Sequence, residues 1–421
     1  MSEVVDGHPL PGPELFEGRL YPQHLLRAAE LLSEIVSRGQ ASDRALAQAF
    51  RADRRLGRRD RLLIQTLVFY GLRYGHALKD WLGVEAPLAQ LAAALWLDGR
   101  LDERLATQAG VDPARWAGRV LTPRMAWSMA TDDAVRLTAA FGDEAAAVAA
   151  ALLMRAPVDI RLDARWPAET VIRALQTDGH EFSPLPGLAR GWRCDAPAAL
   201  VRHPLFLEGA FEIQDAGSQW ITMACAASPG ERWLDLCAGA GGKTLGLAEA
   251  VGPTGRVLAC DTDAQRLARL PERQQRHRLE QIDRQQITGA DDPALAALPL
   301  FDGVLIDAPC SGSGTWRRHP ELKYRSLDLA ALCAIQADLL RQGAQRLRPG
   351  GRLIYATCSL WREENEQQIA AFLAENPDWQ PGDLPAALPE GARIAAGQAR
   401  LRPDRHDCDG FFMAVLLRPL A

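Results

Sequence analysis

Apolar side chains recur every three or four positions from about residue 25 to residue 116. Leu25, Ala29 and Leu32 form one such series, and residues 62–70 hold a second. Because steps of three and four residues place side chains on one face of an α-helix, this spacing predicts amphipathic helices that share a core. Strand-like alternation is scarce, so we predict an all-helical N-terminal domain over residues 1–123.

The pattern becomes mixed in the middle of the chain. Short extended stretches alternate with helical ones, and prolines such as Pro157, Pro184 and Pro204 interrupt them. A continuous apolar run over residues 145–154 is bounded by charged residues and predicts a buried helix. We therefore predict a small α+β connector over residues 124–211.

Strands and helices alternate from residue 212 to the end of the chain. Five short apolar stretches predict strands, at residues 232–236, 256–260, 303–306, 352–356 and 411–417. Helical patterns follow the strands, ending near 251, beginning at 263, and covering about 327–347 and 362–374. Repeated strand–helix units of this length predict a largely parallel, doubly wound sheet. Residues 212–421 are thus expected to form an α/β domain of Rossmann-like type.

Composition agrees with a soluble globular protein of two or three domains. The chain has 421 residues, of which 48% are apolar and 24% charged. No apolar run is long enough for a membrane span, and the acidic, proline-containing start does not resemble a signal peptide. The eight cysteines form no CxxC pair. They predict neither a metal site nor disulfides, and they indicate a reducing cytoplasm.

Charge is unevenly spread along the chain. The formal net charge is −5, which alone would argue against nucleic acid as a partner. Local basic patches nevertheless bind phosphates on acidic proteins, although ordinary solvated helix faces explain such patches equally well. Our candidate phosphate contacts are Arg54, Arg55, Arg58, Arg59, Arg317 and Arg318.

A glycine-rich turn, residues 234–244, follows the first predicted strand of the α/β domain. Gly239, Gly241 and Gly242 let the backbone approach a ligand closely at the start of a helix. The spacing matches neither the phosphate-binding loop GxxxxGK[ST] nor the dinucleotide motif GxGxxG. Asp261 follows the second strand, where an acidic residue can accept both ribose hydroxyls. The turn and the aspartate together predict an adenosine-containing cofactor.

Two cysteines each follow a predicted strand. Cys310 comes three residues after Asp307, and Cys358 stands between a threonine and a serine. Neighbouring strands lie about 5 Å apart, so both thiols are expected to project into one cleft. Isolated cysteines are usually core residues. We interpret the others in that way, namely Cys194, Cys225, Cys237, Cys260, Cys333 and Cys408.

This pair of thiols suits methyl transfer to carbon 5 of a pyrimidine. Carbon 5 of cytosine is a poor nucleophile until a thiolate attacks carbon 6 and converts the ring to an enamine. The carbon 5 proton must then leave, which needs a second group acting as a base. Two neighbouring cysteines can divide these tasks, and Asp307 is placed to hydrogen-bond the cytosine edge.

At these residues the chain resembles the RsmB/Sun family of RNA cytosine-5 methyltransferases. The resemblance spans residue 212 to the C-terminus. Its motifs lie at residues 213–219, 234–244, 307–314, 317–321, 355–359, 363–365 and 409–412. The helical stretches at residues 31–40 and 56–82 resemble the NusB-like RNA-binding domain of the ribosomal RNA member of that family.

The resemblance implies S-adenosylmethionine as cofactor and a cytidine of small-subunit (16S) ribosomal RNA as substrate. It assigns the nucleophile to Cys358 and the release step to Cys310. Two departures concern the cofactor region: Ala240 stands where the family usually has proline, and the acidic residue after the third strand, Asp291 or Asp292, comes late. With Asp291 as our choice, the implied cofactor residues are Cys237, Ala238, Gly239, Ala240, Gly241, Gly242, Lys243, Asp261, Asp291 and Asp307.

Two other functions remain as alternatives. A DNA cytosine-5 methyltransferase would use Cys310 as nucleophile, but the second thiol and the absence of a large target-recognition insert argue against it. A non-catalytic NusB-like RNA-binding factor would keep the sheet as a relic, which the complete motif set disfavours. An adenine N6-methyltransferase would need a different motif at residues 307–310. We expect a cytoplasmic monomer that binds RNA, without a membrane or metal partner.

Overall fold

The chain divides into two compact units, residues 1–155 with 315–327, and residues 156–314 with 328–421. The structure, a computed structural model, describes residues 20–83, 85–116, 119, 121–194 and 200–420. This division differs from the predicted domain boundaries at 123/124 and 211/212, because the helices before residue 155 pack with the helical unit. No helix in the described part of the chain is long and apolar enough to cross a membrane.

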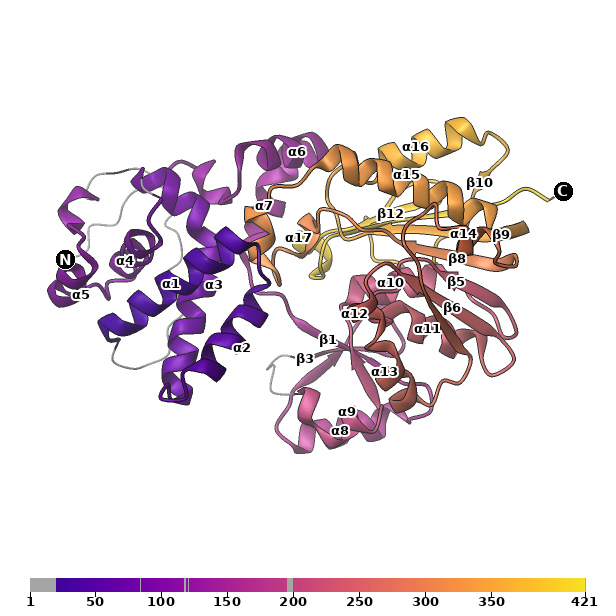
Figure 1. Cartoon of the computed structure of the whole chain (residues 1–421), viewed down its shortest axis with the longest axis horizontal. Helices are drawn as coiled ribbons and strands as arrows, with labels where there is room; N and C mark the ends of the chain where they lie inside the picture. The colour runs from indigo at the N-terminus through magenta and orange to yellow at the C-terminus, as the bar shows by residue number, and fades with distance from the viewer. Residues whose placement is uncertain (1–19, 84, 117–118, 120, 195–199, 421) are drawn as a thin grey trace. The chain divides into compact units, whose positions relative to one another are not determined.

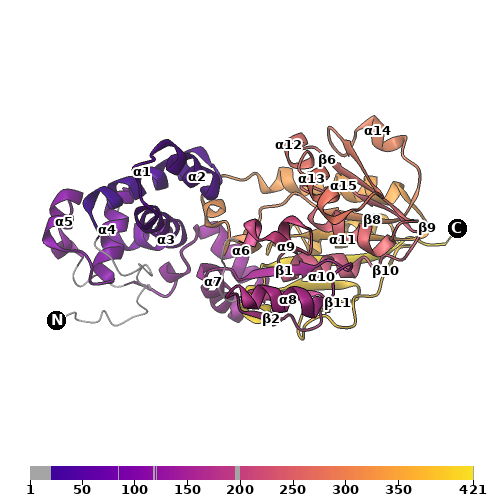
Figure 2. The same cartoon turned by 90° about the horizontal axis from the view of Figure 1, so that it is seen from below.

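The first unit is helical, as the spacing of its apolar residues predicts. Its elements are α1 (Pro22–Arg38), α2 (Ser42–Ala52), α3 (Arg58–Leu82), α4 (Pro87–Leu97), α5 (Glu103–Ala109), η1 (Pro113–Arg115), η2 (Met125–Trp127), α6 (Thr131–Phe141), η3 (Gly142–Glu144) and α7 (Ala145–Leu153). Gly39 and Gly83, both left-handed, end α1 and α3. Figure 2 shows α1, α3 and α4 side by side, and they enclose a core that includes Leu32, Leu67 and Leu91.

A segment from the second half of the sequence completes this helical unit. Residues 315–327 contain the turn η6 (Pro320–Tyr324), which contacts α1 and α3. The Glu321 carboxylate accepts hydrogen bonds from the backbone N–H and the hydroxyl of Ser42, at 3.3 and 3.0 Å. The buried Lys323 ammonium donates to two backbone carbonyls of the unit, at 2.5 and 2.9 Å. These polar contacts explain why the segment departs from the predicted α/β domain.

The second unit begins with a small antiparallel sheet, in the strand order β2-β3-β1-β4. Its elements are β1 (Val158–Leu162), α8 (Ala168–Thr177), β2 (Phe182–Pro184), β3 (Gly191–Cys194), η4 (Leu200–Arg202), α9 (Pro204–Leu207) and β4 (Phe211–Ile213). Ile160, Val171 and Phe211 belong to a core shared by the sheet and α8. The α+β character agrees with the predicted connector.

A nine-stranded sheet forms the rest of this unit (Figure 1). The elements are α10 (Ala216–Ala224), β5 (Arg232–Asp235), α11 (Gly242–Val251), β6 (Arg256–Asp261), α12 (Ala264–Leu267), α13 (Leu270–His277), β7 (Ile282–Gln286), α14 (Pro293–Ala296), β8 (Phe301–Asp307), η5 (Ser313–Thr315), α15 (Leu329–Gln345), β9 (Leu347–Thr357), α16 (Glu366–Glu375), β10 (Gln380–Pro381), β11 (Arg393–Ala395), β12 (Gln398–Leu401), α17 (Pro403–His406) and β13 (Phe411–Leu417).

The strand order is β11-β12-β13-β9-β8-β5-β6-β7, with β10 paired to β13. The strands from β9 to β7 are parallel, whereas β10 to β13 pair antiparallel. The expectation of a largely parallel sheet is therefore correct for one half and wrong for the other. The reason is that the chain after α16 returns as an antiparallel meander rather than through further crossover helices.

Side chains on the parallel strands alternate between two buried faces. On β9, Ile354 and Ala356 belong to the core beneath α10 and α11, whereas Leu353 and Tyr355 belong to the core beneath α15 and α16. Figure 1 shows these helices on opposite sides of the sheet. Because helices cover both faces, the strands read as continuous apolar runs. The carboxyl ends of the neighbours β5, β8 and β9 meet at one edge, where ligands bind in such sheets.

One predicted helix is two helices in the structure. The arginine- and glutamine-rich pattern from residue 263 suggests continuity, but α12 ends at Leu267 and α13 begins at Leu270. Pro271 fits the first turn of a helix but not its interior, where its ring would remove a backbone hydrogen bond. The helical pattern therefore restarts at this proline.

Candidate active site

The two predicted thiols lie side by side at the carboxyl edge of the sheet. Cys310 follows β8 and Cys358 follows β9, and these parallel strands pair Asp307 with Ala356. The Sγ atoms of Cys310 and Cys358 are 3.4 Å apart and share a hydrogen bond. Both side chains are half-buried. Their expected proximity is therefore confirmed, while their separate roles remain predictions.

Cys310 holds its proton tightly. The hydrogen bond with Cys358 and, after it, burial raise the pKa of the Cys310 thiol well above its usual range. Since the thiolate is the nucleophilic form of cysteine, a thiol with a raised pKa is poorly suited to attack a ring carbon. The S–H group of Cys310 can instead donate to the sulfur of Cys358.

An ion pair joins the glycine turn to the strand that precedes Cys310. Lys243, in the first turn of α11, donates from Nζ to Asp307 Oδ2 at 2.6 Å. Burial opposes the charge on Lys243, but Asp307 and, more weakly, Cys358 outweigh it and raise the pKa of the lysine. Lys243 thus remains a cation next to Asp307. Among the described residues, none bonds to the other carboxylate oxygen of Asp307.

Backbone geometry shapes the glycine turn. Gly239 and Gly241 have φ angles of 56° and 84°, left-handed values that favour glycine. A Cβ on Gly241 would lie 2.3 Å from Leu270 Cδ1, whereas a Cβ on Gly242 would meet nothing within 4 Å. Ala240 is not at a positive φ, unlike Gly239 and Gly241. The alanine that stands in place of the family's usual proline therefore does not occupy a left-handed position of the turn.

Asp261 is the last residue of β6 and fastens the turn. Its Oδ2 accepts the backbone N–H of Gly239 at 2.6 Å, and its Oδ1 accepts the N–H of Asp263 at 2.7 Å. Each oxygen keeps a lone pair that can accept a ribose hydroxyl. The predicted ribose contact therefore stays a prediction, and the structure adds a role in holding the turn.

The two candidate adenine contacts differ in what their side chains do. Asp292 caps α14 by accepting the backbone N–H of Ala294 at 2.8 Å, and it also accepts the N–H of Thr288 at 2.7 Å. Asp291 is exposed. Asp291 is accordingly the better candidate for a ligand contact, which remains a prediction.

Sequence reasoning missed one buried carboxylate in the same region. Asp235 ends β5, and its Oδ2 accepts the hydroxyl of Thr244 at 2.7 Å. Burial, more than any charged neighbour, raises the pKa of Asp235 to about 7. Its Oδ1 is buried and has no hydrogen-bond partner among the described residues. The only sequence signal was an acidic residue at the end of the first strand.

These features fit S-adenosylmethionine. Its ribose hydroxyls and its amino group are hydrogen-bond donors, and Asp235 and Asp261 offer acceptors near the turn. The open space facing Gly242 lets the backbone approach a ligand at the start of α11. Cys237 and Ala238 lie in the turn between β5 and Gly239, and the Ala238 N–H donates to the carbonyl of Cys260 at 2.8 Å.

The predicted arginine patches differ in exposure. Around the start of α3, four arginines are exposed, namely Arg54, Arg55, Arg58 and Arg59. Arg317, by contrast, is only 5% exposed, and its guanidinium donates to the carbonyl of Arg155 at 3.1 Å. Arg318 is half-buried. Because a phosphate contact needs an accessible guanidinium, Arg317 is better explained as a residue that holds the segment 315–327 in the helical unit.

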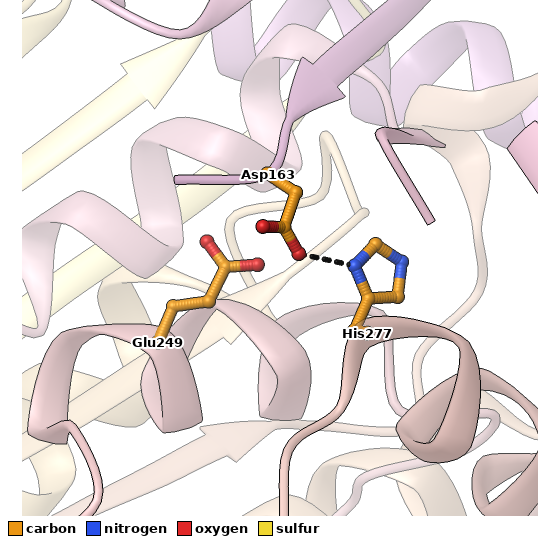
Figure 3. Close-up of side chains that lie close together, drawn as sticks. All are labelled: Asp163, Glu249 and His277. Atoms are coloured by element: carbon orange, nitrogen blue, oxygen red, sulfur yellow. Dashed lines mark hydrogen bonds and ion pairs between the residues drawn. The ribbon is translucent and has the colours of Figure 1, made fainter. Parts of the chain in front are cut away.

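A buried group of residues has the donor types of a metal site. Asp163, Glu249 and His277 bring ligand atoms within 4.8 Å of one another (Figure 3). However, His277 Nδ1 bonds Asp163 at 2.7 Å and its Nε2 bonds Glu212 at 2.8 Å. Burial opposes the charge on His277, but these two carboxylates outweigh it and raise the pKa of the imidazole. Both imidazole nitrogens are thus engaged by carboxylates, and Glu249 pairs with Arg161. Hydrogen bonds and ion pairs within the protein therefore already occupy these three side chains.

Relatives of the chain are ribosomal RNA methyltransferases. Residues 222–417 match a family model described as 16S rRNA methyltransferase RsmB/F. The ribosomal RNA small subunit methyltransferase B of Xanthomonas campestris pv. campestris is 37% identical over 436 residues, which cover 93% of this chain and 96% of the relative.

Solved structures share the fold. The crystal structure of PH0851 covers 95% of this chain and 100% of its own with a TM-score of 0.77 at 24% identity. A methyltransferase homolog from Pyrococcus horikoshii covers 70% of this chain and 97% of its own, with a TM-score of 0.62 at 28% identity. Since the match to the Xanthomonas relative extends over nearly the whole of both chains, the protein belongs to the RsmB/F family of S-adenosylmethionine-dependent ribosomal RNA methyltransferases.

Proposed function

We propose that this protein methylates carbon 5 of a cytidine in small-subunit (16S) ribosomal RNA. The observation that carries the proposal is the pair of sulfurs, Cys310 and Cys358, 3.4 Å apart at the ends of adjacent parallel strands. A single thiol suffices for a nucleophile, whereas two thiols suit a reaction that forms an adduct and then removes a proton. The descriptions of the family and of the Xanthomonas relative as ribosomal RNA methyltransferases support the ribosomal substrate.

Cys358 is the nucleophile in this proposal. Its Sγ bonds to carbon 6 of the cytosine ring, which makes carbon 5 electron-rich. The free oxygen of Asp307 accepts a hydrogen bond from the exocyclic amine of the base, while Lys243 fixes the carboxylate through the other oxygen. The raised pKa of Cys310 supports this division of roles, because a thiol that keeps its proton is a poor nucleophile.

The glycine turn, Asp235, Asp261 and Asp291 hold the cofactor. S-adenosylmethionine, when bound, supplies a methyl group on a positively charged sulfur. Asp261 accepts the ribose hydroxyls and Asp291 contacts the adenine, while Gly242 leaves room for the ligand at the start of α11.

Cys310 serves the release step. After methylation the carbon 5 proton leaves to Cys310, and the bond between Cys358 and carbon 6 breaks to restore the ring. The contact with Cys358 is the main cause of the raised Cys310 pKa. Once Cys358 is bonded to carbon, the two sulfurs no longer share a proton, so Cys310 releases its own proton to solvent more readily and can then accept the carbon 5 proton as the base.

The helical unit is proposed to bind RNA as a NusB-like domain. Its exposed arginines at the start of α3 supply the positive charge, and the segment 315–327 links the unit directly to the loop that carries Cys310.

The test uses single substitutions, Cys310→Ala and Cys358→Ala, incubated with S-adenosylmethionine and small-subunit RNA that lacks the modification. A denaturing gel then reports covalent protein–RNA adducts. Cys333→Ala is the matched control, because Cys333 is also a half-buried free thiol. We expect adduct to accumulate with Cys310→Ala, none with Cys358→Ala, and normal turnover with Cys333→Ala.

Other outcomes separate the alternatives. Adduct with Cys358→Ala alone would exchange the two roles and favour the mechanism of DNA cytosine-5 methyltransferases. No adduct from either variant, together with an inactive wild type, would point to a non-catalytic RNA-binding factor. Mapping the methylated base in product RNA checks the position on the ring.

A further inference from the structure

A fully buried carboxylate, Glu364, bridges the two loops that carry the thiols. It lies two residues before α16, and none of its surface is exposed. Its carboxylate accepts hydrogen bonds from hydroxyl, amide and backbone N–H donors, with no cation among its bonded partners in the described residues. Burying a carboxylate without a cation is costly. Stability alone therefore does not explain this carboxylate, whereas its bonds to the two thiol loops suggest a role in the reaction.

Glu364 forms hydrogen bonds with Ser311, the residue that follows Cys310. Its Oε1 accepts the backbone N–H of Ser311 at 2.8 Å, and its Oε2 accepts the hydroxyl of Ser311 at 2.6 Å. The amide of Gln336, from α15, donates to Glu364 Oε1 at 3.1 Å and to the carbonyl of Pro309 at 2.9 Å. Both residues that flank Cys310 are therefore fixed by Glu364 or its amide partner.

The same carboxylate also binds Ser359, the residue that follows Cys358. The hydroxyl of Ser359 donates to Glu364 Oε2, the oxygen that also accepts the Ser311 hydroxyl. The Glu364 carbonyl accepts the hydroxyl of Tyr355, on β9, at 2.7 Å. Asn365 adds a further link, because its amide donates to the carbonyl of Ser359 at 2.9 Å. One buried oxygen thus joins the residues that follow the two thiols.

We propose that Glu364 is a positioning residue that holds the sulfurs of Cys310 and Cys358 at the separation needed to release the methylated base. This inference rests on the function proposed above. A shift of either loop would stretch a bond to Glu364, so the carboxylate couples the positions of both thiols. Without it, Cys358 can still attack the ring, but Cys310 no longer sits where the carbon 5 proton leaves.

A carboxylate suits this task better than an amide. Its two oxygens have lone pairs for all four donors that converge here, whereas the nitrogen of a glutamine side chain cannot accept. Glu364→Gln would therefore leave part of the cluster unpaired while keeping the shape of the side chain. The substitution is accordingly a test of hydrogen bonding rather than of packing.

The experiment compares Glu364→Gln and Ser359→Ala with the wild type, all with both thiols intact. Glu363→Gln is the control, since Glu363 is the adjacent carboxylate but is partly exposed. For Glu364→Gln we expect kcat to fall by about 100-fold, as for misplaced catalytic groups generally. The KM for S-adenosylmethionine should stay unchanged, and covalent RNA adduct should accumulate on the denaturing gel. Ser359→Ala should show the same signature more weakly, and Glu363→Gln should behave as wild type.

Adduct accumulation distinguishes positioning from a purely structural role. If Glu364→Gln lost adduct, turnover and cofactor binding together, or kept normal turnover, the inference would be overturned. Ser359→Ala keeps the buried carboxylate and removes one donor, so it carries the test if Glu364→Gln fails to fold. Cys310→Ala, assayed in parallel, separates failure of the proposed function from failure of the positioning role. If Cys310→Ala forms no adduct, the proposed function is refuted. If Cys310→Ala forms adduct but the Glu364 and Ser359 variants do not, only the positioning role is refuted.

Discussion

Replacing His277 tests whether buried charges hold the small antiparallel sheet, β2-β3-β1-β4, against helix α13 of the same unit. The imidazole lies at the end of α13 with no exposed surface, and it bonds Asp163, just after β1, and Glu212, on β4 (Figure 3 shows the Asp163 side). His277→Ala removes both bonds. The two carboxylates would then depend on the neighbouring arginines Arg165, Arg273 and Arg276.

The magnitude follows from the two lost bonds. A hydrogen bond to a charged group contributes about 1.5–3 kcal/mol, so two of them contribute about 3–6 kcal/mol. Removing one partner of a buried ion pair costs a similar amount, about 3–5 kcal/mol. The His203–Asp178 pair is the control, because its separation is also 2.8 Å but Asp178 is 58% exposed. His203→Ala should therefore cost only about 1 kcal/mol.

The stability lost in His277→Ala should decrease as the pH rises. The pKa of His277 is raised above its ordinary value of 6.5 in the folded protein. A group with a raised pKa stabilises the folded protein fully when the pH is below its pKa in the unfolded chain. This contribution is lost as the pH rises through its pKa in the folded protein. Asp163 and Glu212 have lowered pKa values, so both stay ionised at pH 6. The difference between wild type and His277→Ala should thus be largest near pH 6 and shrink in more alkaline solution.

Hydrogen exchange measured by mass spectrometry reports the loss locally, which matters because the chain has two compact units. Peptides from β1, β4 and α13 should lose protection by about 100-fold or more, since about 1.4 kcal/mol corresponds to tenfold. A loss of less than tenfold at pH 6, or a loss that does not vary with pH, would refute the reasoning.

Two further predictions concern the cofactor turn and the RNA path. Gly241→Ala forces a Cβ to within 2.3 Å of Leu270 and should weaken S-adenosylmethionine binding at least about tenfold by calorimetry, given a left-handed strain of about 1–2 kcal/mol. Gly230→Ala, also at positive φ but with its nearest atom at 3.7 Å, should bind normally, and equal losses in both would contradict the steric argument. Neutralising the four exposed arginines at the start of α3 should reduce the salt dependence of RNA binding by up to about 3 in the logarithmic slope. An unchanged slope, matching that of the exposed control Arg104→Gln, would exclude this patch from the RNA path.

Local patterns in the sequence predicted much of the fold and the reacting groups. The apolar period of 3.6 identified the helical unit, and the stretch 411–417 has the bounds of β13. The positions of Cys310 and Cys358 after two strands were enough to predict that they meet, because parallel neighbours bring their carboxyl ends to one edge. Such signals survive in a single sequence because they depend on neighbours along the chain.

Tertiary structure decided what depends on distant partners. The antiparallel half of the sheet was not predicted, because strand direction is set by which edge a returning segment reaches. The transfer of residues 315–327 to the helical unit depends on Ser42 and the backbone near α3, far away in sequence. Glu364 belongs to the motif at residues 363–365, but the sequence did not show that both thiol loops converge on its carboxylate. Periodicity along the chain records which side of an element is buried, but the partner that covers it is fixed only when the chain has folded.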